Sequence, residues 1–221
     1  MIIAVDFALG YKEHSDVAWQ MSVNNYDSYN TLKDINEKFS ELKNFVSFQP
    51  VYYAYRKLPS SVQNHHETDF HAPKDSEDDD GFTIDQSEEC LYKKRDFCVK
   101  RADGKPIKAT ASSPLLETIK QMCVYDMDKE EWFEYVSIFA KTCFVYDENF
   151  KKMVLVEDLE KCSYNIDTKS HNKIVDCANS IFSEENPLQD RLVLNNIGKL
   201  EIFHTDIIPS INVNGVLLRG E

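Results

Sequence analysis

The C-terminal segment, residues 207–220, constrains the fold of this chain most strongly. Pro209 stands directly before a short run in which apolar and polar residues alternate, and Asn214-Gly215 separates that run from a second, apolar one. Asn-Gly between two such runs is the strongest short signal for a β-hairpin. Proline has no backbone N–H, so it is tolerated at the start of a strand and not in its middle. We therefore expect a terminal hairpin that begins just after Pro209.

The first 55 residues predict the opening of an α/β layer. Their order is strand, helix, helix and strand, at residues 2–9, 14–26, 31–44 and 45–55. The spacing of Val17 and Met21 favours the first of these helices, with Ser15 or Asp16 as its cap. Pro50 divides the last segment into one strand or two short ones. A sheet with a helical layer follows from this order.

The middle of the chain has a different character. Residues 59–89 are polar and acidic, with the run Asp75–Gly81, and they cannot bury enough apolar surface to fold alone. Helical patterns then occupy most of residues 114–181. They are expected at about residues 114–124, 130–143, 154–161 and 172–182. A short apolar stretch at 192–194, which residues 200–203 extend, precedes the terminal hairpin.

Charge and hydropathy restrict the partners of the chain. Its net charge is −13, whereas phosphate binding needs a basic face, so nucleic acids and anionic membrane surfaces are disfavoured. No apolar run reaches the roughly 20 residues of a membrane span. The N-terminus has no basic region and no cleavage site of a signal peptide. A protein or peptide partner remains, either alone or within a larger complex.

Six cysteines are candidates for disulfides: Cys90, Cys98, Cys123, Cys143, Cys162 and Cys177. None forms Cys-x-x-Cys, which disfavours a zinc ribbon and a dithiol redox site. Three readings stay open: three disulfides in an oxidising lumen, buried free thiols, or a metal site. Among the pairings we favour Cys123–Cys143 and Cys162–Cys177, because each would join consecutive helices.

No complete catalytic constellation is visible. A dithiol enzyme would carry its nucleophile after the first strand, where the start of a helix lowers the thiol pKa, but residues 10–16 contain no cysteine. His65, His66 and His71 lie near the acidic run without a fixed geometry, so we predict no metal site and no cofactor there. Calcium at Asp75–Gly81 is the one cation considered, although the spacing of an EF-hand is not matched.

The order of several motifs resembles the lumenal central region of vacuolar sorting receptors. Glu131-Trp132-Phe133-Glu134-Tyr135-Val136 is similar to that family's Trp-Trp-Asp-Tyr-Val element. Other similar segments are Leu116 to Cys123, Cys143, Lys161-Cys162, Asp176-Cys177, Glu185-Asn186-Pro187-Leu188, Phe48-Gln49-Pro50-Val51-Tyr52, Val5-Asp6-Phe7, and Ile208 to Asn214 with Arg219-Gly220. The family's cysteines near the first helix and after the tyrosine-rich strand are absent here, at residues 12–16 and 55–58.

The resemblance implies a fold and a domain plan. The expected class is α/β, a thioredoxin-like sheet with a cysteine-bearing helical insertion and a long acidic loop. Residues 1–58 and 191–221 would form the two halves of the thioredoxin-like domain. Residues 59–106 would be the acidic insertion and residues 107–190 the helical one. The sheet would consist of residues near 2–9, 45–55 and 207–219.

The resemblance also implies a function. A proline at position 209 is usually cis in thioredoxin-like folds, and a groove beside it, formed by Ile208, Pro209, Ser210 and Arg219, would bind a partner. The expected role is a non-catalytic protein- or peptide-binding module in protein sorting, located in the endomembrane or secretory lumen. The alternative is a redox-inactive structural subunit of a larger intracellular assembly.

Overall fold

A computed structural model describes residues 15–42, 45–54, 88–90, 98–100, 114–149, 151–156, 158–164, 166, 169–181, 187–203 and 208–219. The strand expected at residues 2–9 lies outside these ranges, as does the polar, acidic stretch expected at 59–89 except for its last two residues. The division of the chain into residues 1–58, 59–106, 107–190 and 191–221 therefore stays a prediction.

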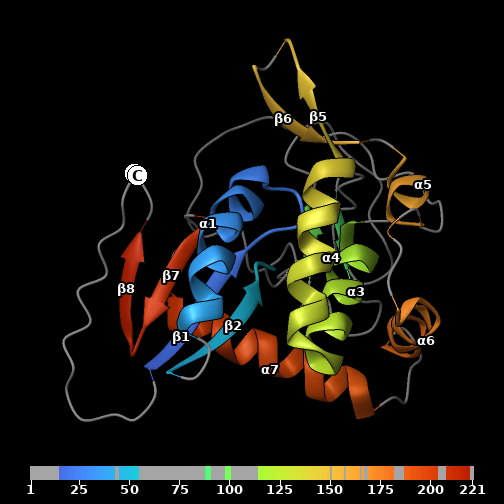
Figure 1. Cartoon of the computed structure of the whole chain (residues 1–221). Helices are drawn as coiled ribbons and strands as arrows, with labels where there is room; N and C mark the ends of the chain where they lie inside the picture. Colours follow the sequence, from blue (N-terminus) through green and yellow to red (C-terminus); the bar gives the residue numbers. More distant parts are fainter. Residues whose placement is uncertain are drawn as a thin grey trace, which may run out of the picture.

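A four-stranded mixed sheet joins the two ends of the described chain (Figure 1). Its order is β2 (Val46–Tyr52), β1 (Ser15–Met21), β7 (Ser210–Val213) and β8 (Val216–Arg219). β1 runs parallel to β2 and antiparallel to β7, and β7 is antiparallel to β8. The mixed α/β class predicted from the sequence is thus confirmed, with strands from both ends of the chain in one sheet.

The central strand β1 lies where the sequence predicted a helix, so that prediction is wrong. Val17, Trp19 and Met21 are all buried, and they alternate along one face of the strand. Val17 and Met21 are four residues apart, and this spacing fits both a helix and a strand. Trp19, between them, fits the two-residue period of a strand and does not fit the spacing of a helix. The expectation that Ser15 or Asp16 caps a helix fails with it.

The C-terminal hairpin is confirmed. Val213 faces Val216 in the register, and the turn between them has φ of 50° at Asn214 and 87° at Gly215. Positive φ at both central residues is the geometry that Asn-Gly favours. The Ile208–Pro209 peptide bond is cis, as expected, and β7 begins at the next residue. The Asn214 backbone and side chain both bond Asp16, at 2.9 Å each, and so tie the turn to β1.

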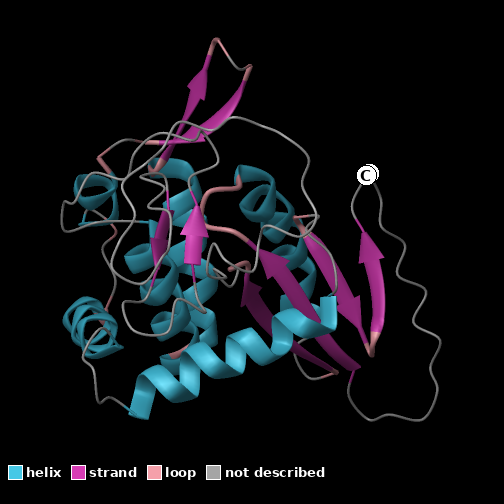
Figure 2. Cartoon of the chain, turned by 180° about the vertical axis from the view of Figure 1, so that it is seen from behind, coloured by secondary structure: helices cyan, strands magenta, loops and turns pink. Residues whose placement is uncertain are grey.

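Helices cover the two faces of the sheet. α1 (Tyr26–Leu42) connects β1 to β2 and confirms the helix expected at residues 31–44. α7 (Pro187–Phe203) is a single helix, whereas the sequence pattern predicted only short apolar stretches at residues 192–194 and 200–203. Figures 1 and 2 show α1 on one face and α7 on the other. Because both faces are covered, the central strand β1 is buried along its apolar side.

The outer edge of β2 is closed by a side chain from α7. Pro50 lies within β2, which is one continuous strand, and its missing N–H is tolerated because β2 is outermost among the described strands on that side of the sheet. Two residues later, the Tyr52 N–H donates to Asn196 Oδ1, and Asn196 Nδ2 donates to the Tyr52 carbonyl, both at 2.8 Å. The Asn196 amide therefore takes the place of a neighbouring strand and satisfies two buried backbone groups.

The helical insertion packs beside the sheet. It contains α3 (Pro114–Met127), α4 (Lys129–Thr142), α5 (Leu159–Tyr164) and α6 (His171–Ile181). Asp128 caps α4, since its side chain accepts from the N–H groups of Glu130 and Glu131. Trp132 and Phe139 of α4 are fully buried in the core. None of the helices in the described ranges is long and apolar enough to cross a bilayer.

Two short hairpins complete the fold. β3 (Glu88–Cys90) pairs with β4 (Cys98–Lys100), and β5 (Phe144–Asp147) pairs with β6 (Lys152–Leu155). β6 corrects the prediction of a helix at residues 154–161, because Val154 is a strand residue and α5 starts only at Leu159. The β5–β6 hairpin projects beyond the end of α4 (Figure 1).

The disulfides use the predicted cysteines in a different pairing. Cys123 bonds Cys177, with Cα atoms 6.2 Å apart, and Cys143 bonds Cys162, with Cα atoms 5.5 Å apart. The favoured pairs Cys123–Cys143 and Cys162–Cys177 are therefore wrong. The physical reason is that α3 packs against both α4 and α6, so the order of the helices along the chain does not decide which cysteines meet. Cys98 is also disulfide-bonded, and it lies opposite Cys90 in the β3–β4 register.

We predict that Asn196→Ala destabilises the chain by about 2 kcal/mol, because it leaves a buried N–H and a buried carbonyl of Tyr52 without partners. Urea unfolding followed by circular dichroism measures this change. Asn195→Ala is the matched control, since Asn195 is exposed on the same helix, and it should change stability by less than about 0.5 kcal/mol. Equal losses in the two variants would contradict the role assigned to the Asn196 amide.

Candidate functional site

A cleft of about 380 Å³ opens beside the cis-proline, and we call it the cis-proline cleft. Four parts of the chain form it: the β1–α1 junction, the end of β2, β6, and the residue before Pro209. Its lining residues are Ser22, residues 24–27, Tyr53, Lys152, Met153 and Ile208. This volume lies at the lower end of the range for ligand pockets.

Asn25 joins the two sides of this cleft. Its side-chain Oδ1 accepts from the Ser28 N–H at 2.9 Å, which is the bond of a helix cap at the start of α1. Its Nδ2 donates to the carbonyl of Ile208 at 3.4 Å. One amide therefore fixes the beginning of α1 against the residue that precedes the cis-proline.

The floor of the cleft is a closed turn of serine and asparagine. The Asn25 N–H donates to the Ser22 carbonyl at 3.0 Å, and the Ser22 N–H donates to Ser28 Oγ at 3.4 Å. Ser22 Oγ in turn accepts from the Asn24 N–H at 3.4 Å. Because these bonds satisfy the backbone locally, the turn holds its shape without a ligand.

Aromatic and apolar side chains form the upper wall. The ring of Tyr26 meets the ring of Phe144 edge-on, with centroids 5.3 Å apart, which seats the β5–β6 hairpin on α1. Tyr53 continues the sheet, because its N–H donates to the Met21 carbonyl at 2.6 Å. Met153 and Ile208, both half-buried, complete this wall. The cleft thus combines a polar floor with an apolar wall.

The groove predicted from the sequence is present only in part. Ile208 lines the cleft, whereas Pro209 is half-buried beside it. Ser210 is buried in β7 opposite Gln20, so it does not face the cleft. Arg219 lies opposite Ser210 in β8, and its side chain is outside the described residues. A binding role for these four residues stays a prediction.

Sequence reasoning missed the residues at the strand-to-helix junction. The strand was placed at residues 2–9, so the junction was expected at residues 10–16, and Asn25, Tyr26, Tyr53 and Met153 were not considered. The available signal was the pair Asn24-Asn25, since asparagine is favoured just before the first residue of a helix. The helix predicted at residues 14–26 runs through this pair and obscures the signal.

Nucleophilic chemistry has little support in this cleft. Residues 22–28, which join β1 to α1, contain no cysteine, although the junction lies elsewhere than expected. Ser22 and Ser28 hydrogen-bond to the backbone and to asparagine, and the described lining residues include no histidine that could act as their base. Within the described ranges, no group of three histidine, cysteine or acidic side chains could hold a metal ion.

A second polar cluster lies in the core, and we call it the Glu117 network. Glu117 Oε1 accepts from Gln121 Nε2 at 3.0 Å and from the Tyr135 hydroxyl at 2.9 Å, and its Oε2 accepts from Ser163 Oγ at 2.7 Å. Gln121 also bonds the hydroxyls of Tyr29 and Tyr52, and the Trp132 indole donates to the Tyr52 hydroxyl. The network therefore spans α1, β2, α3, α4 and α5.

Burial perturbs the titration of this network. It raises the pKa of the Glu117 carboxyl, while the Lys120 charge and three hydrogen bonds act in the opposite direction. It also raises the pKa values of Tyr29, Tyr52 and Tyr135 well above their ordinary value. A carboxyl with a shifted pKa often marks a functional site. Glu117, however, is only 1% exposed, and its hydrogen-bond partners Gln121, Tyr135 and Ser163 are all buried. We therefore assign the network to packing.

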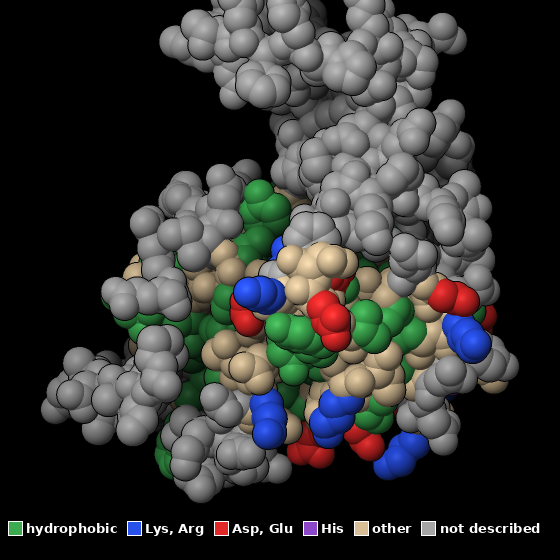
Figure 3. Space-filling view, turned by 90° about the horizontal axis from the view of Figure 1, so that it is seen from above, with side chains coloured by type: hydrophobic (Ala, Val, Ile, Leu, Met, Phe, Trp, Pro, Cys, Tyr) green, Lys and Arg blue, Asp and Glu red, His purple; other side chains and the backbone are tan. Residues whose placement is uncertain are grey.

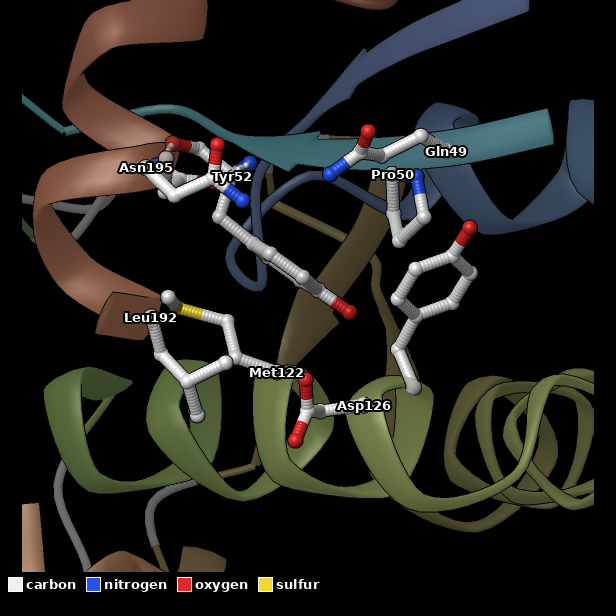
Figure 4. Close-up of a pocket in the computed structure, with 9 residues that line it drawn as sticks. Gln49, Pro50, Tyr52, Met122, Asp126, Leu192 and Asn195 are labelled. Carbon is white, nitrogen blue, oxygen red and sulfur yellow. Dashed lines mark hydrogen bonds between the residues drawn. The ribbon is translucent and has the colours of Figure 1, made fainter. Parts of the chain in front are cut away.

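A smaller pocket of about 70 Å³ lies between β2, α3 and α7 (Figure 4). In the close-up, the Tyr52 ring points from β2 toward α3, where Met122 and Asp126 lie, while Leu192 and Asn195 approach from α7. Asp126, which lines this pocket, forms an ion pair with Arg191 of α7. This volume suits a few water molecules, so the cis-proline cleft is the better candidate for a ligand.

Comparisons with known proteins give one family. The model of the vacuolar sorting receptor thioredoxin-like domain matches residues 20–221. Among solved structures, the crystal structure of Chlamydia trachomatis DsbA aligns with a TM-score of 0.42 and 12% identity, over 93% of this chain and 77% of that chain. No curated protein matches the chain.

We predict that Glu117→Gln changes the pH dependence of stability. The raised pKa of Glu117 means that the folded state keeps its proton where the unfolded state has lost it. Its contribution to the free energy of unfolding is complete below the ordinary pKa of 4.5 and falls as the pH rises from there through the folded-state pKa. The wild type should thus lose stability relative to Glu117→Gln over that interval.

Urea unfolding at a series of pH values measures this difference. The matched control is Glu134→Gln, which removes an exposed carboxyl on α4 outside the network. A stability difference between wild type and Glu117→Gln that does not change with pH would contradict the raised pKa.

Proposed function

The chain belongs to the vacuolar sorting receptor thioredoxin-like domain family, and on this basis we propose that it is a non-catalytic module that binds an extended polypeptide in the cis-proline cleft. The observation that supports this most directly is the bond between Asn25 and Ile208. A dithiol enzyme needs a thiolate at the start of this helix. Here an amide occupies that position and contacts the residue before the cis-proline.

The architecture of the cleft supports a polypeptide ligand. Thioredoxin-like folds offer backbone groups beside the cis-proline to extended chains, and the cleft continues from Ile208 to the end of β2. Ser22, Asn24 and Asn25 supply donors and acceptors for a peptide backbone, while Tyr26, Tyr53 and Met153 supply apolar contact. A cleft with a polar floor and an apolar wall suits a chain whose backbone and side chains must both be bound.

The proposed location is the lumen of the endomembrane system. Family membership supports it, and the bridges Cys123–Cys177 and Cys143–Cys162 fit an oxidising compartment. Protein cargo is the corresponding class of partner. The net charge of −13 disfavours nucleic acid as a ligand.

A structural role within a larger assembly is the second candidate. Val216 and Leu218 lie on β8, the last strand of the described sheet, and are 62% and 37% exposed, which favours a packing surface. The two functions differ in the effect of Val216→Lys. A structural subunit would lose its place in the assembly, whereas a peptide-binding module would keep its peptide affinity.

We predict that Asn24→Trp fills the cleft and lowers the affinity for a selected peptide by at least about tenfold, since one blocked side-chain contact changes binding by that order. Peptides are selected with the full chain from a displayed random library, and fluorescence anisotropy gives their dissociation constants. Asn195→Trp, in the smaller pocket beside α7, is the matched control and should leave affinity unchanged.

The same preparation is tested for thiol–disulfide exchange, for which we expect no catalysis. Turnover in a disulfide-reduction assay would contradict a non-catalytic role. A library that yields no peptide, or a peptide whose affinity Asn195→Trp lowers and Asn24→Trp does not, would contradict binding in the cis-proline cleft.

A further inference from the structure

The Cys143–Cys162 disulfide closes the base of the β5–β6 hairpin. Cys143 immediately precedes β5, and the N–H of Val156, which immediately follows β6, donates to the Cys143 carbonyl at 2.9 Å. Cys162 lies on α5, 19 residues further along the chain. Met153, in the hairpin that this loop encloses, lines the cis-proline cleft. One covalent bond therefore fastens both the hairpin and α5 to the end of α4.

α5 has few other attachments in the described part of the chain. It contains six residues, and a helix shorter than about 12 residues is marginal by itself. Of its described side chains, Leu159 and Ser163 are buried. Ser163 Oγ donates to Glu117 Oε2 at 2.7 Å and accepts from Lys120 Nζ at 3.2 Å. Among the contacts that the structure describes, the disulfide and the docking of Ser163 on Glu117 are therefore the main restraints on this helix.

The Cys123–Cys177 disulfide has stronger support. It joins α3 and α6, which contain 14 and 11 residues and pack against each other. α6 buries an apolar face beside Cys177, made of Ile174, Ala178 and Ile181. Local opening costs more free energy where more buried apolar contact must be broken. We therefore expect Cys143–Cys162 to open before Cys123–Cys177.

The two sulfurs of the Cys143–Cys162 bridge differ in access. Cys143 is 0% exposed, whereas Cys162 is half-buried. Figure 3 looks onto the end of the molecule from which the hairpin projects, and acidic and basic side chains lie side by side there, so a thiolate does not meet a surface of a single charge. The Thr142 hydroxyl lies 3.6 Å from Cys143 Sγ, within reach of a thiolate that forms there. Attack at Cys162, with Cys143 as the leaving group, fits these observations.

We propose that the Cys143–Cys162 disulfide is a reducible clasp, which a dithiol opens at Cys162 and which decides whether α5 stays docked on Glu117 and the β5–β6 hairpin stays fixed at its base. The chain is the substrate of this reaction and not its catalyst, so a single reduction per molecule is compatible with the non-catalytic module proposed above. No ligand of the cis-proline cleft is required for it.

The exchange proceeds in two steps. A thiolate of the dithiol attacks Cys162 Sγ and forms a mixed disulfide there, while the bond to Cys143 Sγ breaks and Cys143 leaves as a thiolate that takes up a proton. The second thiol of the dithiol, as a thiolate, then attacks the sulfur of its own first thiol, and Cys162 leaves and is protonated in turn. Two electrons and two protons have then passed to the two cysteines, and the dithiol has become a disulfide.

Opening the clasp has a local consequence. Without the covalent bond, the hydrogen bond from Ser163 to Glu117 is the principal described contact that keeps α5 in place, and the carboxyl loses this donor when α5 leaves. The base of the hairpin keeps the contact of Phe144 with Tyr26. The wall of the cleft that the hairpin supplies is therefore less restrained in the reduced chain.

Rates of reduction test the clasp directly. The folded full chain is treated with dithiothreitol, the thiols are trapped with N-ethylmaleimide at intervals, and peptide mapping by mass spectrometry follows each cysteine. We expect Cys143 and Cys162 to become reactive at least about tenfold faster than Cys123 and Cys177, since a modest difference in the free energy of local opening changes a rate by that order. With a monothiol, glutathione, the first mixed disulfide should form at Cys162 and not at Cys143.

Variants of two serines provide the matched pair. Ser163→Ala should speed the reduction of Cys143–Cys162 severalfold and leave the rate of Cys123–Cys177 unchanged, because it removes a restraint on α5. Ser180 Oγ donates to the Cys177 carbonyl on α6, so Ser180→Ala should leave the rate of Cys143–Cys162 unchanged. At a dithiothreitol concentration that opens only Cys143–Cys162, hydrogen exchange should show lost protection in α5 and the hairpin and unchanged protection in the four-stranded sheet.

Several results would overturn the clasp. Equal rates for the two disulfides, or a first mixed disulfide at Cys143, would contradict it. Unchanged protection of α5 after reduction would show that the bridge restrains nothing, and lost protection throughout the sheet would show that it holds the whole fold. Equal acceleration by Ser180→Ala and Ser163→Ala would remove the role assigned to α5. Because peptide affinity is not part of these measurements, such results leave the proposed function intact.

Discussion

A buried chain of hydrogen bonds joins the helical insertion to the sheet. It starts at the indole of Trp132 on α4, passes through the Tyr52 hydroxyl at the end of β2 and Gln121 on α3, and reaches the Glu117 carboxyl. Each member is nearly or fully buried, so an unpaired donor or acceptor would be costly. The apolar contacts around Trp132 are non-directional, whereas these hydrogen bonds require a defined geometry between the helices and the sheet.

The position of the cis-proline cleft depends on this arrangement. The end of β2 carries both Tyr52, in the network, and Tyr53, in the lining of the cleft. α4 leads directly into β5, so its packing also determines where the β5–β6 hairpin stands over α1. The polar floor has a separate origin, because the junction at residues 22–28 closes on itself. The polar floor at residues 22–28 and the part of the wall on the β5–β6 hairpin belong to separate segments, so the sequence of one can change without the other.

The sequence predicted the elements whose signals are local. Asn214-Gly215 requires a particular backbone conformation, and the apolar residues of α4, among them Trp132 and Phe139, recur at helical spacing. β1 and β6 were misread because they are short and the spacing of four between Val17 and Met21 belongs to both periods. Disulfide pairing was wrong because it depends on which helices meet in space, and nothing near Cys123 indicates α6. The cleft was found only at Ile208, since its other residues come together through tertiary structure.

The Asn196 amide, bound to the backbone of β2, makes the two outer strands of the described sheet unequal as sites for pairing with another strand. Pro50 offers no donor on the outer edge of that strand, and the Asn196 amide already occupies the backbone of Tyr52. In the described part of the chain, the strand order ends on the other side at β8, with Val216 and Leu218 exposed. Among the described strands, β8 is therefore the outer strand that could pair with a strand of another polypeptide, whereas the end of β2 is occupied by a side chain of its own fold.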